Sequence, residues 1–572
     1  MTDQNHSRVR REDTEICTSP KQPRRWVRVL LLVLVLALGS ALRLVNLGES
    51  PPGLNQDEAI NAWNAYCLLR TGKDQTGAPW PIFYSRAIGE NRSTLAYYVW
   101  MPFQLLGGLN VTTTRLPAVF AGIACLLTIS SVGNRLFGYP VGLVSAVFLC
   151  TNPWHLHLSR WGHEANIGPL LGTLPLAVLL ASGIPIGPDG GDRRHLKRGL
   201  AMLAGTITGL VCYGYPAIRI FVPVLMLFLV AVTWTRWWEC LQTREGRSAV
   251  GIFLVAVTVT VGPLVAVHLF DPAIGRRAQM TVLWHPDDNA LVRIGQVVDR
   301  YVRHFGVDWL FLRGDQYLVQ SPPDSGQFDV CLLPCMLLGA FAVAREARTS
   351  ASHRILLIWV LAYPVGDVFW HHASMHALRS APGMSSLIVL AALGAVRGGT
   401  WIFRWFPRFA WPACLLLSVM WGTLSARYLV RFFIDYNCRP AISRAYHVDL
   451  VQACRWLRPR LGEFDAVFMT TRDMNQPFAI ALVVLGYDPA QWFSDGWDVI
   501  ATDSWDVYTR VGKLRFLYDA SALHYLRTLE DNTEPNRVLF LVRPGEFGME
   551  RPIHTVPGPK GEASLWACEV TL

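Results

Sequence analysis

The sequence predicts an α-helical membrane protein that crosses the bilayer many times and ends in a smaller α/β domain. Apolar residues make up 52% of the 572-residue chain and charged residues only 16%, and the mean hydropathy is +0.27. Soluble domains carry about 25% charged residues. Uncharged runs of the roughly 20 residues that a bilayer requires recur along the chain, for example at 116–133, 165–188 and 249–270.

The first apolar segment sets the expected orientation of the chain. Residues 1–25 are polar and basic and are predicted to form a disordered cytoplasmic tail. The apolar segment 26–47 follows, and the many later apolar runs favour a retained anchor over a cleaved signal peptide. Because basic loops gather on the cytoplasmic side, the transmembrane module at 26–433 is expected to place its loops 48–94 and 271–327 outside.

Hydropathy and the distribution of basic residues together predict eleven membrane spans. They are 26–47, 114–134, 139–157, 165–184, 199–217, 219–235, 249–270, 328–344, 355–370, 382–396 and 409–427. The apolar run 95–109 is short for a span and is predicted to lie at the interface or to insert partly. The expected total is therefore about 11–13 transmembrane helices.

The hydropathy falls after Arg431, and residues 434–572 are predicted to form an external, soluble α/β domain. Several runs rich in β-branched and aromatic residues predict strands, and an amphipathic run predicts a helix at 448–457. The predicted strands are 466–469, 514–518, 538–542 and 564–570.

The composition also excludes some functional classes. The net charge of +10 comes from basic residues in short loops between apolar runs, which is typical of cytoplasmic anchoring and not of a nucleic-acid interface. The 22 tryptophans and 17 tyrosines fit aromatic belts at the two membrane surfaces. The 12 cysteines are scattered without a C-x-x-C pair, so the sequence predicts no zinc site.

Two adjacent carboxylates follow the first apolar segment, in the stretch 51–59 (PPGLNQDEA). Asp57 precedes a run with apolar residues at helical spacing, so one interpretation is that it caps a helix. The other interpretation is chemical. Asp57, Glu58 and the later Glu90 belong to one external loop, where converging carboxylates suit general-base catalysis or a divalent metal ion.

The order of several motifs resembles a known family. After 51–59 come Glu-Asn-Arg at 90–92, Thr-Arg-Leu-Pro at 114–117, Asn-Pro-Trp at 152–154 with Ser159-Arg160 and Glu164, His-Phe-Gly at 304–306 and His-Ala-Leu-Arg at 376–379. This order is similar to that of the polytopic class C glycosyltransferases of the protein O-mannosyltransferase type, whose bacterial members include the lipid A aminoarabinose transferase. The resemblance covers roughly residues 26–430.

The resemblance implies an inverting transfer of a sugar from a polyprenyl or dolichyl phosphate to a hydroxyl acceptor on the outer face of the membrane. Asp57 would take the proton from the acceptor hydroxyl, and Glu58 would assist it. Glu90 would shape the acceptor side or the metal side of the site. Where some relatives have Glu-Lys-Pro, this chain has Glu90-Asn91-Arg92, so Arg92 is the candidate for the corresponding cation.

The leaving phosphate of such a donor needs cations, and three further arginines are candidates. Arg379, in the turn before a late span, would pair bidentately with the phosphate, and Arg115 and Arg160 are the other two. The alternative for all three is ordinary snorkelling at a helix end. A divalent metal ion is compatible with the family, and Glu90 and His376 are its candidate ligands.

Two other functions share this architecture: a transporter or flippase of lipid-linked sugars, and a polymerase of lipid-linked glycans. Transporters usually show internal repeats and ionisable residues within their spans. Here the spans are nearly free of charge and the acids cluster in loops, which favours a glycosyltransferase. The resemblance places it in a bacterial inner membrane, with a protein, lipid or polysaccharide as the acceptor.

Overall fold

The computed structural model describes most of the chain. The described residues are 24–570 except 185–196, 272–281, 284, 286, 322–324, 371–374, 503–504 and 519–536. The tail predicted at 1–25 therefore lies outside the described residues apart from its last two positions. Arg25 is already the first residue of helix α1 (Arg25–Leu44).

Each of the eleven segments predicted to span the membrane contains a helix. These helices are α1, α4 (Val111–Phe137), α5 (Tyr139–Thr151), α7 (Gly168–Ser182), α8 (Arg198–Leu210), α9 (Pro216–Val232), α11 (Arg244–Phe270), α14 (Leu333–Glu346), α15 (Ala351–Ala362), α17 (Met384–Trp405) and α18 (Pro407–Val430). Helices α5, α8 and α15 have only 12–13 residues, about 20 Å of helix against a bilayer core of about 30 Å.

By length and apolar composition, six helical stretches of the described residues qualify as membrane spans. The number becomes seven if α9 and α10 (Trp234–Gln242), which meet at an angle of 74°, form one bent span. The chain is therefore an integral membrane protein, and the full number of spans stays a prediction.

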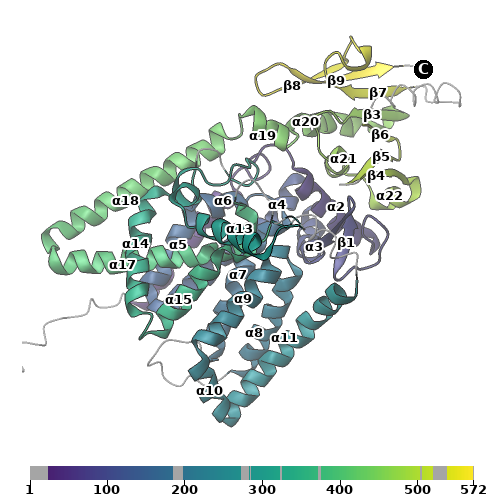
Figure 1. Cartoon of the computed structure of the whole chain (residues 1–572). Helices are drawn as coiled ribbons and strands as arrows, with labels where there is room; N and C mark the ends of the chain where they lie inside the picture. The colour runs from purple at the N-terminus through teal and green to yellow at the C-terminus, as the bar shows by residue number, and fades with distance from the viewer. Residues whose placement is uncertain are drawn as a thin grey trace, which may run out of the picture.

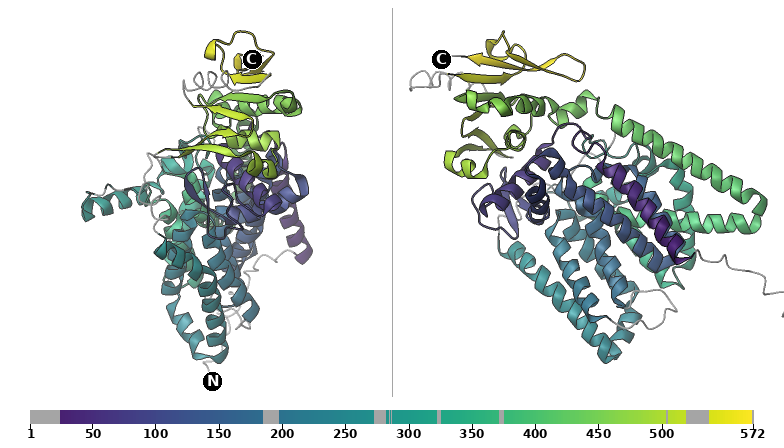
Figure 2. Two further views of the ribbon diagram at one scale, coloured as in Figure 1. Left: turned by 90° about the vertical axis from the view of Figure 1, so that its right-hand side faces the viewer. Right: turned by 180° about the vertical axis from the view of Figure 1, so that it is seen from behind.

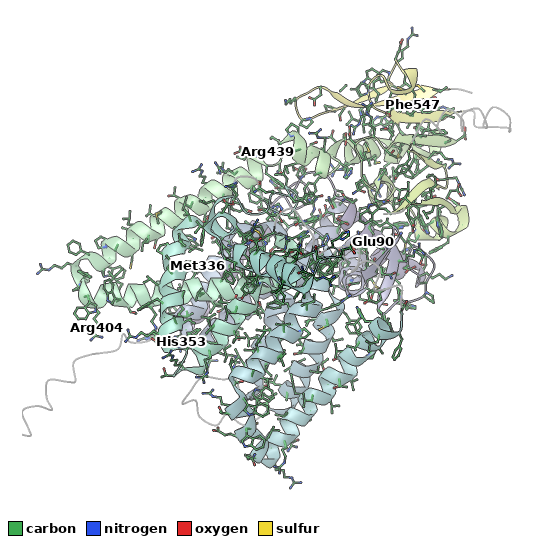
Figure 3. All side chains as sticks on the ribbon, viewed as in Figure 1. Glu90, Met336, His353, Arg404, Arg439 and Phe547 are labelled. Atoms are coloured by element: carbon green, nitrogen blue, oxygen red, sulfur yellow. The ribbon has the colours of Figure 1, made fainter. Side chains whose placement is uncertain are left out.

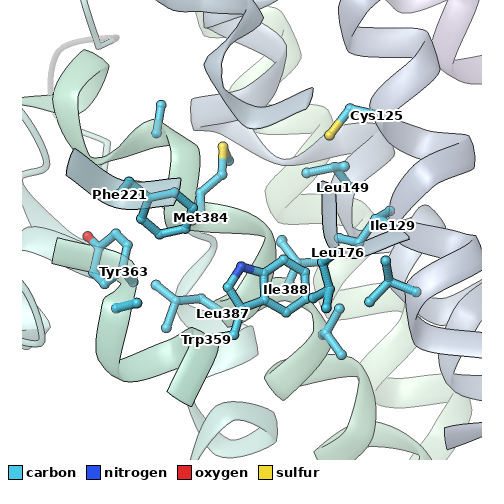
Figure 4. Packing of buried hydrophobic residues seen from close by; sticks show 14 of the residues in the cluster. Cys125, Ile129, Leu149, Leu176, Phe221, Trp359, Tyr363, Met384, Leu387 and Ile388 are labelled. Carbon is cyan, nitrogen blue, oxygen red and sulfur yellow. The ribbon is translucent and has the colours of Figure 1, made fainter. Parts of the chain in front are cut away.

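The helices pack around an apolar core, shown from close by in Figure 4. Trp359 of α15, Phe221 of α9 and Ile388 of α17 meet there with Leu149 of α5 and Leu176 of α7. Helices α1, α11 and α18, by contrast, leave most of their apolar side chains fully or partly exposed. Apolar side chains that point outward all along a long helix are typical of a surface that faces lipid.

Two glycines allow α14 to approach α17 closely. A Cβ atom on Gly339 would collide with the carbonyl oxygen of Leu390, and one on Gly394 would collide with that of Cys335. Membrane helices associate largely through close van der Waals packing, and small residues at the contact make that packing possible.

The chain after α1 folds over one end of the bundle. It forms α2 (Gln56–Thr71), an antiparallel hairpin of β1 (Tyr84–Ala87) and β2 (Glu90–Ser93), and α3 (Leu95–Gly107). Helix α3 is the short apolar run predicted to lie at the interface. Its 13 residues span about 20 Å, too little to cross a bilayer core alone.

The C-terminal segment forms an α/β domain, as predicted (Figure 1). Its helices are α19 (Pro440–Ala445), α20 (Val448–Leu457), α21 (Pro477–Leu485) and α22 (Pro489–Asp495). Its strands are β3 (Ala466–Thr470), β4 (Trp497–Ala501), β5 (Asp506–Val511), β6 (Leu514–Leu517), β7 (Val538–Val542), β8 (His554–Pro557) and β9 (Ala563–Val570).

The strand order of this mixed sheet is β4-β5-β6-β3-β7-β9-β8, and β3 is parallel to both β6 and β7. The predicted strands are β3, β6, β7 and β9, and the predicted helix is α20. The sequence pattern does not reveal β4, β5 and β8. These strands lie toward the two edges of the sheet, where exposed polar residues interrupt the apolar pattern.

The C-terminal domain packs directly on α2 and shares a core with it. Trp492 of α22 meets Trp63 of α2 edge to face with the ring centroids 5.6 Å apart, and its indole N–H donates to the carbonyl oxygen of Gln75. Although the apolar spacing predicts an amphipathic helix, eleven of the 16 residues of α2 are buried. The bundle covers one side of α2, and α21 and α22 cover another.

The two ends of the bundle carry different groups. Figure 3 shows Glu90 beside the C-terminal domain, whereas His353 and Arg404 lie at the far end of the bundle. His353 and Arg404 flank the connections α14–α15 and α17–α18, which carry several arginines and which the eleven predicted spans leave on the cytoplasmic side. Residues that the sequence assigns to opposite sides of the membrane therefore lie at opposite ends of the bundle.

We expect Trp492→Ala to loosen the contact between α2 and the C-terminal domain. Truncating a buried tryptophan typically costs about 3–5 kcal/mol, so the melting temperature of the purified protein in detergent should fall by several degrees. The control is Trp505→Ala, which removes an exposed tryptophan of the same domain. Equal melting temperatures for the two variants would contradict a shared core.

Candidate functional site

A capping box fixes the start of α2. The Asn55 side chain accepts a hydrogen bond from the Asp57 N–H at 3.0 Å, and the Glu58 carboxylate accepts one from the Asn55 N–H at 3.0 Å. The interpretation of Asp57 as the helix cap is therefore wrong, because Asn55 already supplies the cap and Asp57 lies in the first turn. The side chain of Asp57 is 27% exposed, whereas that of Glu58 is 0% exposed.

Glu58 is buried in an ion pair with Arg115 of α4. Arg115 Nη2 lies 2.9 Å from Glu58 Oε1, and Arg115 Nε lies 3.2 Å from Oε2. Oε2 also accepts a hydrogen bond from the Gly162 N–H, and Arg115 donates to three carbonyl oxygens in the segment 47–53. Neither of these two predicted site residues presents a polar atom to solvent, so their contacts support a structural role.

Arg160 also donates its hydrogen bonds to the main chain. Its guanidinium donates to the carbonyl oxygens of Leu42, Val45 and Ser50 and lies 4.7 Å from the ring centroid of Phe433. These contacts hold the chain where it leaves α1. The predicted role of Arg160 as a ligand of the donor phosphate finds no support in this geometry.

Asp57 and Arg92 form the charged pair at the centre of the candidate site. Arg92 Nη2, on β2, lies 2.6 Å from Asp57 Oδ1, and Arg92 Nη1 lies 4.0 Å from Glu164 Oε2. The same Glu164 oxygen accepts a hydrogen bond from the Asn61 amide at 2.6 Å and lies 3.5 Å from His163 Nδ1. Arg92 is thus held between two carboxylates that come from distant parts of the chain.

Acidic neighbours keep Arg92 charged. Burial lowers the pKa of Arg92, but Asp57, Glu164 and Glu90 together raise the pKa by more, so it lies above its ordinary value. Glu90 is the first residue of β2 and lies beside the C-terminal domain (Figure 3). The structure therefore brings three predicted residues, Asp57, Glu90 and Arg92, into one electrostatic cluster.

Sequence reasoning missed Asn61, His163 and Glu164 as members of this cluster. Asn61 lies four residues after Asp57 on α2, so helical spacing was a usable signal for placing the two on one side of the helix. Glu164 opens the short 3₁₀ helix η1 (Glu164–Ile167). Its motif is part of the family resemblance, but no local pattern connects it with Arg92.

A second cationic position lies on α16 (Ala377–Ser380). The Arg379 guanidinium lies 4.9 Å from the ring centroid of Trp370, and its Nη1 atom is buried without a hydrogen-bond partner among the described residues. Helix α16 packs against η1, which begins with Glu164. Arg379 and the Asp57–Arg92 pair therefore belong to the same end of the protein.

Two buried carboxylates hold α16 in place. Asp315 accepts a hydrogen bond from the Ala377 N–H at 2.7 Å, and Asp367 accepts one from the His376 N–H at 3.0 Å. Burial raises the pKa of Asp315 to about 6.

The candidate metal ligands do not form a metal site in the part of the chain that the structure describes. There, no group of three His, Cys, Asp or Glu side chains is placed to hold an ion. The charge of Glu90 raises the pKa of Arg92, and His376 Nε2 lies 3.1 Å from the side-chain amide of Gln320.

No protein-family model matches this chain, and no curated protein matches its sequence. Solved structures, however, share its fold. ArnT from Cupriavidus metallidurans bound to undecaprenyl phosphate has a TM-score of 0.52 at 12% identity, covering 95% of this chain and 98% of that chain. The apo form of the same protein has a TM-score of 0.51 at 12% identity, covering 95% and 97%.

A second similar structure is the archaeal oligosaccharyltransferase AglB from Archaeoglobus fulgidus, in complex with an inhibitory peptide and a dolichol-phosphate. Its TM-score is 0.49 at 11% identity, and the match covers 90% of this chain and 69% of that chain. The likeness to ArnT extends over the membrane bundle and the C-terminal domain, because it covers nearly the whole of both chains. At this identity it defines the fold. The chain has the class C glycosyltransferase fold, as the resemblance of its motifs predicts.

Proposed function

We propose that this protein is an inverting glycosyltransferase that takes its sugar from a polyprenyl or dolichyl phosphate and transfers it to a hydroxyl acceptor. The observation that carries the proposal is the contrast between Asp57 and Glu58. Asp57 is partly exposed beside Arg92, whereas Glu58 is buried in its pair with Arg115. The fold supports the donor class, because ArnT was solved with undecaprenyl phosphate.

In the proposed reaction Asp57 is the general base. It takes the proton of the acceptor hydroxyl while the hydroxyl oxygen attacks the anomeric carbon of the donor sugar. A C–O bond to the acceptor forms as the bond between the anomeric carbon and the phosphate oxygen breaks, so the configuration inverts. Arg92 donates a hydrogen bond to Oδ1 of Asp57 and so holds the carboxylate that accepts the proton.

The neighbours of Asp57 make it a positioned base. The capping box fixes the first turn of α2, and Glu164 lies 4.0 Å from the terminal nitrogen of Arg92 that does not contact Asp57. A base must be held within hydrogen-bond reach of the proton that it removes, and such fixed contacts reduce the motion that would carry it out of reach. Glu58 contributes indirectly, through the position of the turn.

The leaving group of this reaction is a lipid phosphate, whose oxygen gains negative charge as its bond to the sugar breaks. A fixed guanidinium at that point stabilises the transition state. We assign this role to Arg379, because its buried Nη1 has no partner among the described residues and two carboxylates hold its helix. Arg115 and Arg160 are assigned to the structure, because backbone oxygens already take their hydrogen bonds.

We infer that the site faces the external side of a bacterial inner membrane. The far end of the bundle carries the basic connections, which favours a cytoplasmic location for that end. A transporter or flippase would place ionisable side chains along its spans. Here the acids of the candidate site gather at one end of the bundle, which supports chemistry at the level of the lipid headgroups. A protein, a lipid or a polysaccharide could supply the acceptor hydroxyl.

Asp57→Asn should reduce sugar transfer by about 100-fold or more, since an amide cannot take the proton of the acceptor. The melting temperature should stay close to that of the native protein, because the amide keeps the shape of the side chain. The assay uses purified protein in liposomes, radiolabelled polyprenyl-phosphate sugars, and membrane extract as the source of acceptor. Glu49→Gln, at an exposed acid of the same loop, is the matched control. Unchanged transfer by Asp57→Asn would refute the base assignment, and no transfer by the native protein from any such donor would refute the class.

Arg379→Gln should weaken binding of undecaprenyl phosphate by about 10- to 100-fold, since a hydrogen bond to a charged group is worth about 1.5–3 kcal/mol. The measurement is a binding titration of the purified protein with the lipid phosphate. The control is Arg397→Gln, which removes an arginine that pairs with Glu346 on the exposed surface of the α14–α17 pair. Equal affinity in the two variants would remove Arg379 from the donor site.

Glu58→Gln should act on stability. It leaves the Arg115 cation buried without its counter-charge, which typically costs about 3–5 kcal/mol. We therefore expect a lower melting temperature and a lower yield of folded protein, with part of the loss recovered in the double variant Glu58→Gln/Arg115→Gln. If Glu58→Gln instead melted like the native protein and lost transfer, Glu58 would be a catalytic residue and not a structural one.

A further inference from the structure

Helix α13 (Ala290–Arg303) carries an apolar stripe that no other part of the described chain covers. Leu291, Ile294, Val298 and Val302 recur at helical spacing and are 81%, 59%, 53% and 61% exposed. An amphipathic helix of a folded protein normally turns such a stripe toward the core. On α13 the stripe is the outer face.

The opposite face of α13 is fixed to the protein. Arg300 Nη2 lies 2.8 Å from Asp367 Oδ2, and His304 Nε2, just after the helix, lies 3.1 Å from the same oxygen. The Tyr301 hydroxyl donates to the carbonyl oxygen of Leu361 at the end of α15. These contacts fix the orientation of α13 and turn the apolar stripe away from the bundle. The stripe is therefore exposed although the helix is firmly attached.

The helix lies at the level where a membrane surface is expected. It projects sideways from the molecule close to the junction of the bundle and the C-terminal domain (Figure 2, left). The lipid-facing surface extends to this end of the bundle, since α11 ends in the exposed Leu269 and Phe270 and α15 exposes Leu361. His268, in the last turn of α11, contacts Tyr84 of β1, which places the end of α11 at the same level as the candidate site.

We propose that α13 lies on the membrane surface at the end of the bundle that carries Asp57, with its apolar stripe among the lipid acyl chains. Interfacial helices of this kind combine an apolar face with basic residues that reach the headgroups. On the polar side, Arg303 and Asp299 form an exposed pair that faces solvent at the headgroup level, whereas Arg300 is bound to Asp367 on the side of the protein. Lipid is favoured over a second copy of the chain because the stripe continues a surface that already faces lipid.

If α13 lies on the membrane surface, its contacts link the membrane to Arg379 on α16. The Asp367 carboxylate that binds Arg300 and His304 also accepts a hydrogen bond from the His376 N–H, three residues before Arg379. The depth at which α13 rests would thereby set the height of α16 above the bilayer. The proposal for α13 itself stands without the proposed function, because it rests on the exposed stripe and its position.

The test places a fluorescent non-natural amino acid at residue 294 or 298 of the full chain, or at 303 on the exposed polar side as the matched control. Each protein is reconstituted into vesicles of phosphatidylcholine and phosphatidylglycerol, with and without brominated acyl chains. We expect blue-shifted emission at 294 and 298 and strong loss of fluorescence with the brominated lipid. At 303 we expect red-shifted emission and quenching by aqueous iodide.

Similar emission and similar iodide quenching at all three positions would overturn the proposal. Blue-shifted emission at 294 and 298 that is insensitive to brominated lipid and disappears when the protein is diluted in lipid would also overturn it, in favour of contact with a second copy. The probe positions are exposed, so the fold should tolerate them, and an unchanged melting temperature confirms this for each variant. No sugar transfer is measured, so failure of the proposed function would leave this test unaffected.

Discussion

The buried ion pair of Glu58 and Arg115 is the interaction on which the end of the protein that carries the candidate site depends. Two charges removed from water support a fold only when their remaining polar atoms are also satisfied. Here the backbone N–H groups of Asn55 and Gly162 donate hydrogen bonds to Glu58. Arg115 donates hydrogen bonds to three carbonyl oxygens of residues 47–53. The pair therefore joins the exit of α1, the first turn of α2, α4 and the turn before η1. Asp57 precedes Glu58 by one residue, about 100° around the helix, so it is fixed in space while its own side chain remains partly exposed.

The C-terminal domain completes this arrangement from the other side. Apolar residues of α2 and of this domain form one core, in which Trp63 contacts Trp492. Backbone contacts strengthen the joint, because the Leu54 N–H donates to the carbonyl oxygen of Tyr446 at 2.7 Å. The helix that carries the candidate base thus lies between the membrane module and the α/β domain. A change in the packing of the C-terminal domain would be transmitted to the first turn of α2 without any contact with Asp57.

The arginines of this region show how one residue type serves opposite purposes. Arg115 and Arg160 give their hydrogen bonds to backbone oxygens and thereby stabilise chain turns at the end of the bundle. Arg92 is shared between Asp57 and Glu164, and Arg379 lies against an aromatic ring with one buried nitrogen unpartnered among the described residues. All four sit near the ends of apolar segments in the sequence. The surroundings of Arg92, Arg115 and Arg160 differ because these residues meet partners 35, 57 and 118 positions away, whereas Arg379 contacts Trp370, nine positions before it.

The sequence by itself determined the helices of the bundle, the strands β3, β6, β7 and β9, and helix α20. Each depends on a local run of apolar residues that is long enough to identify its structure. It also placed Asp57, Glu90 and Arg92 in one loop, because that loop is continuous in the chain. Only the tertiary structure decided that Asn55 caps α2, that Glu58 is buried while Asp57 is not, and that Glu164 and Asn61 belong to the cluster. Burial and ion pairing depend on which distant segments meet, and no periodicity within a short window records that.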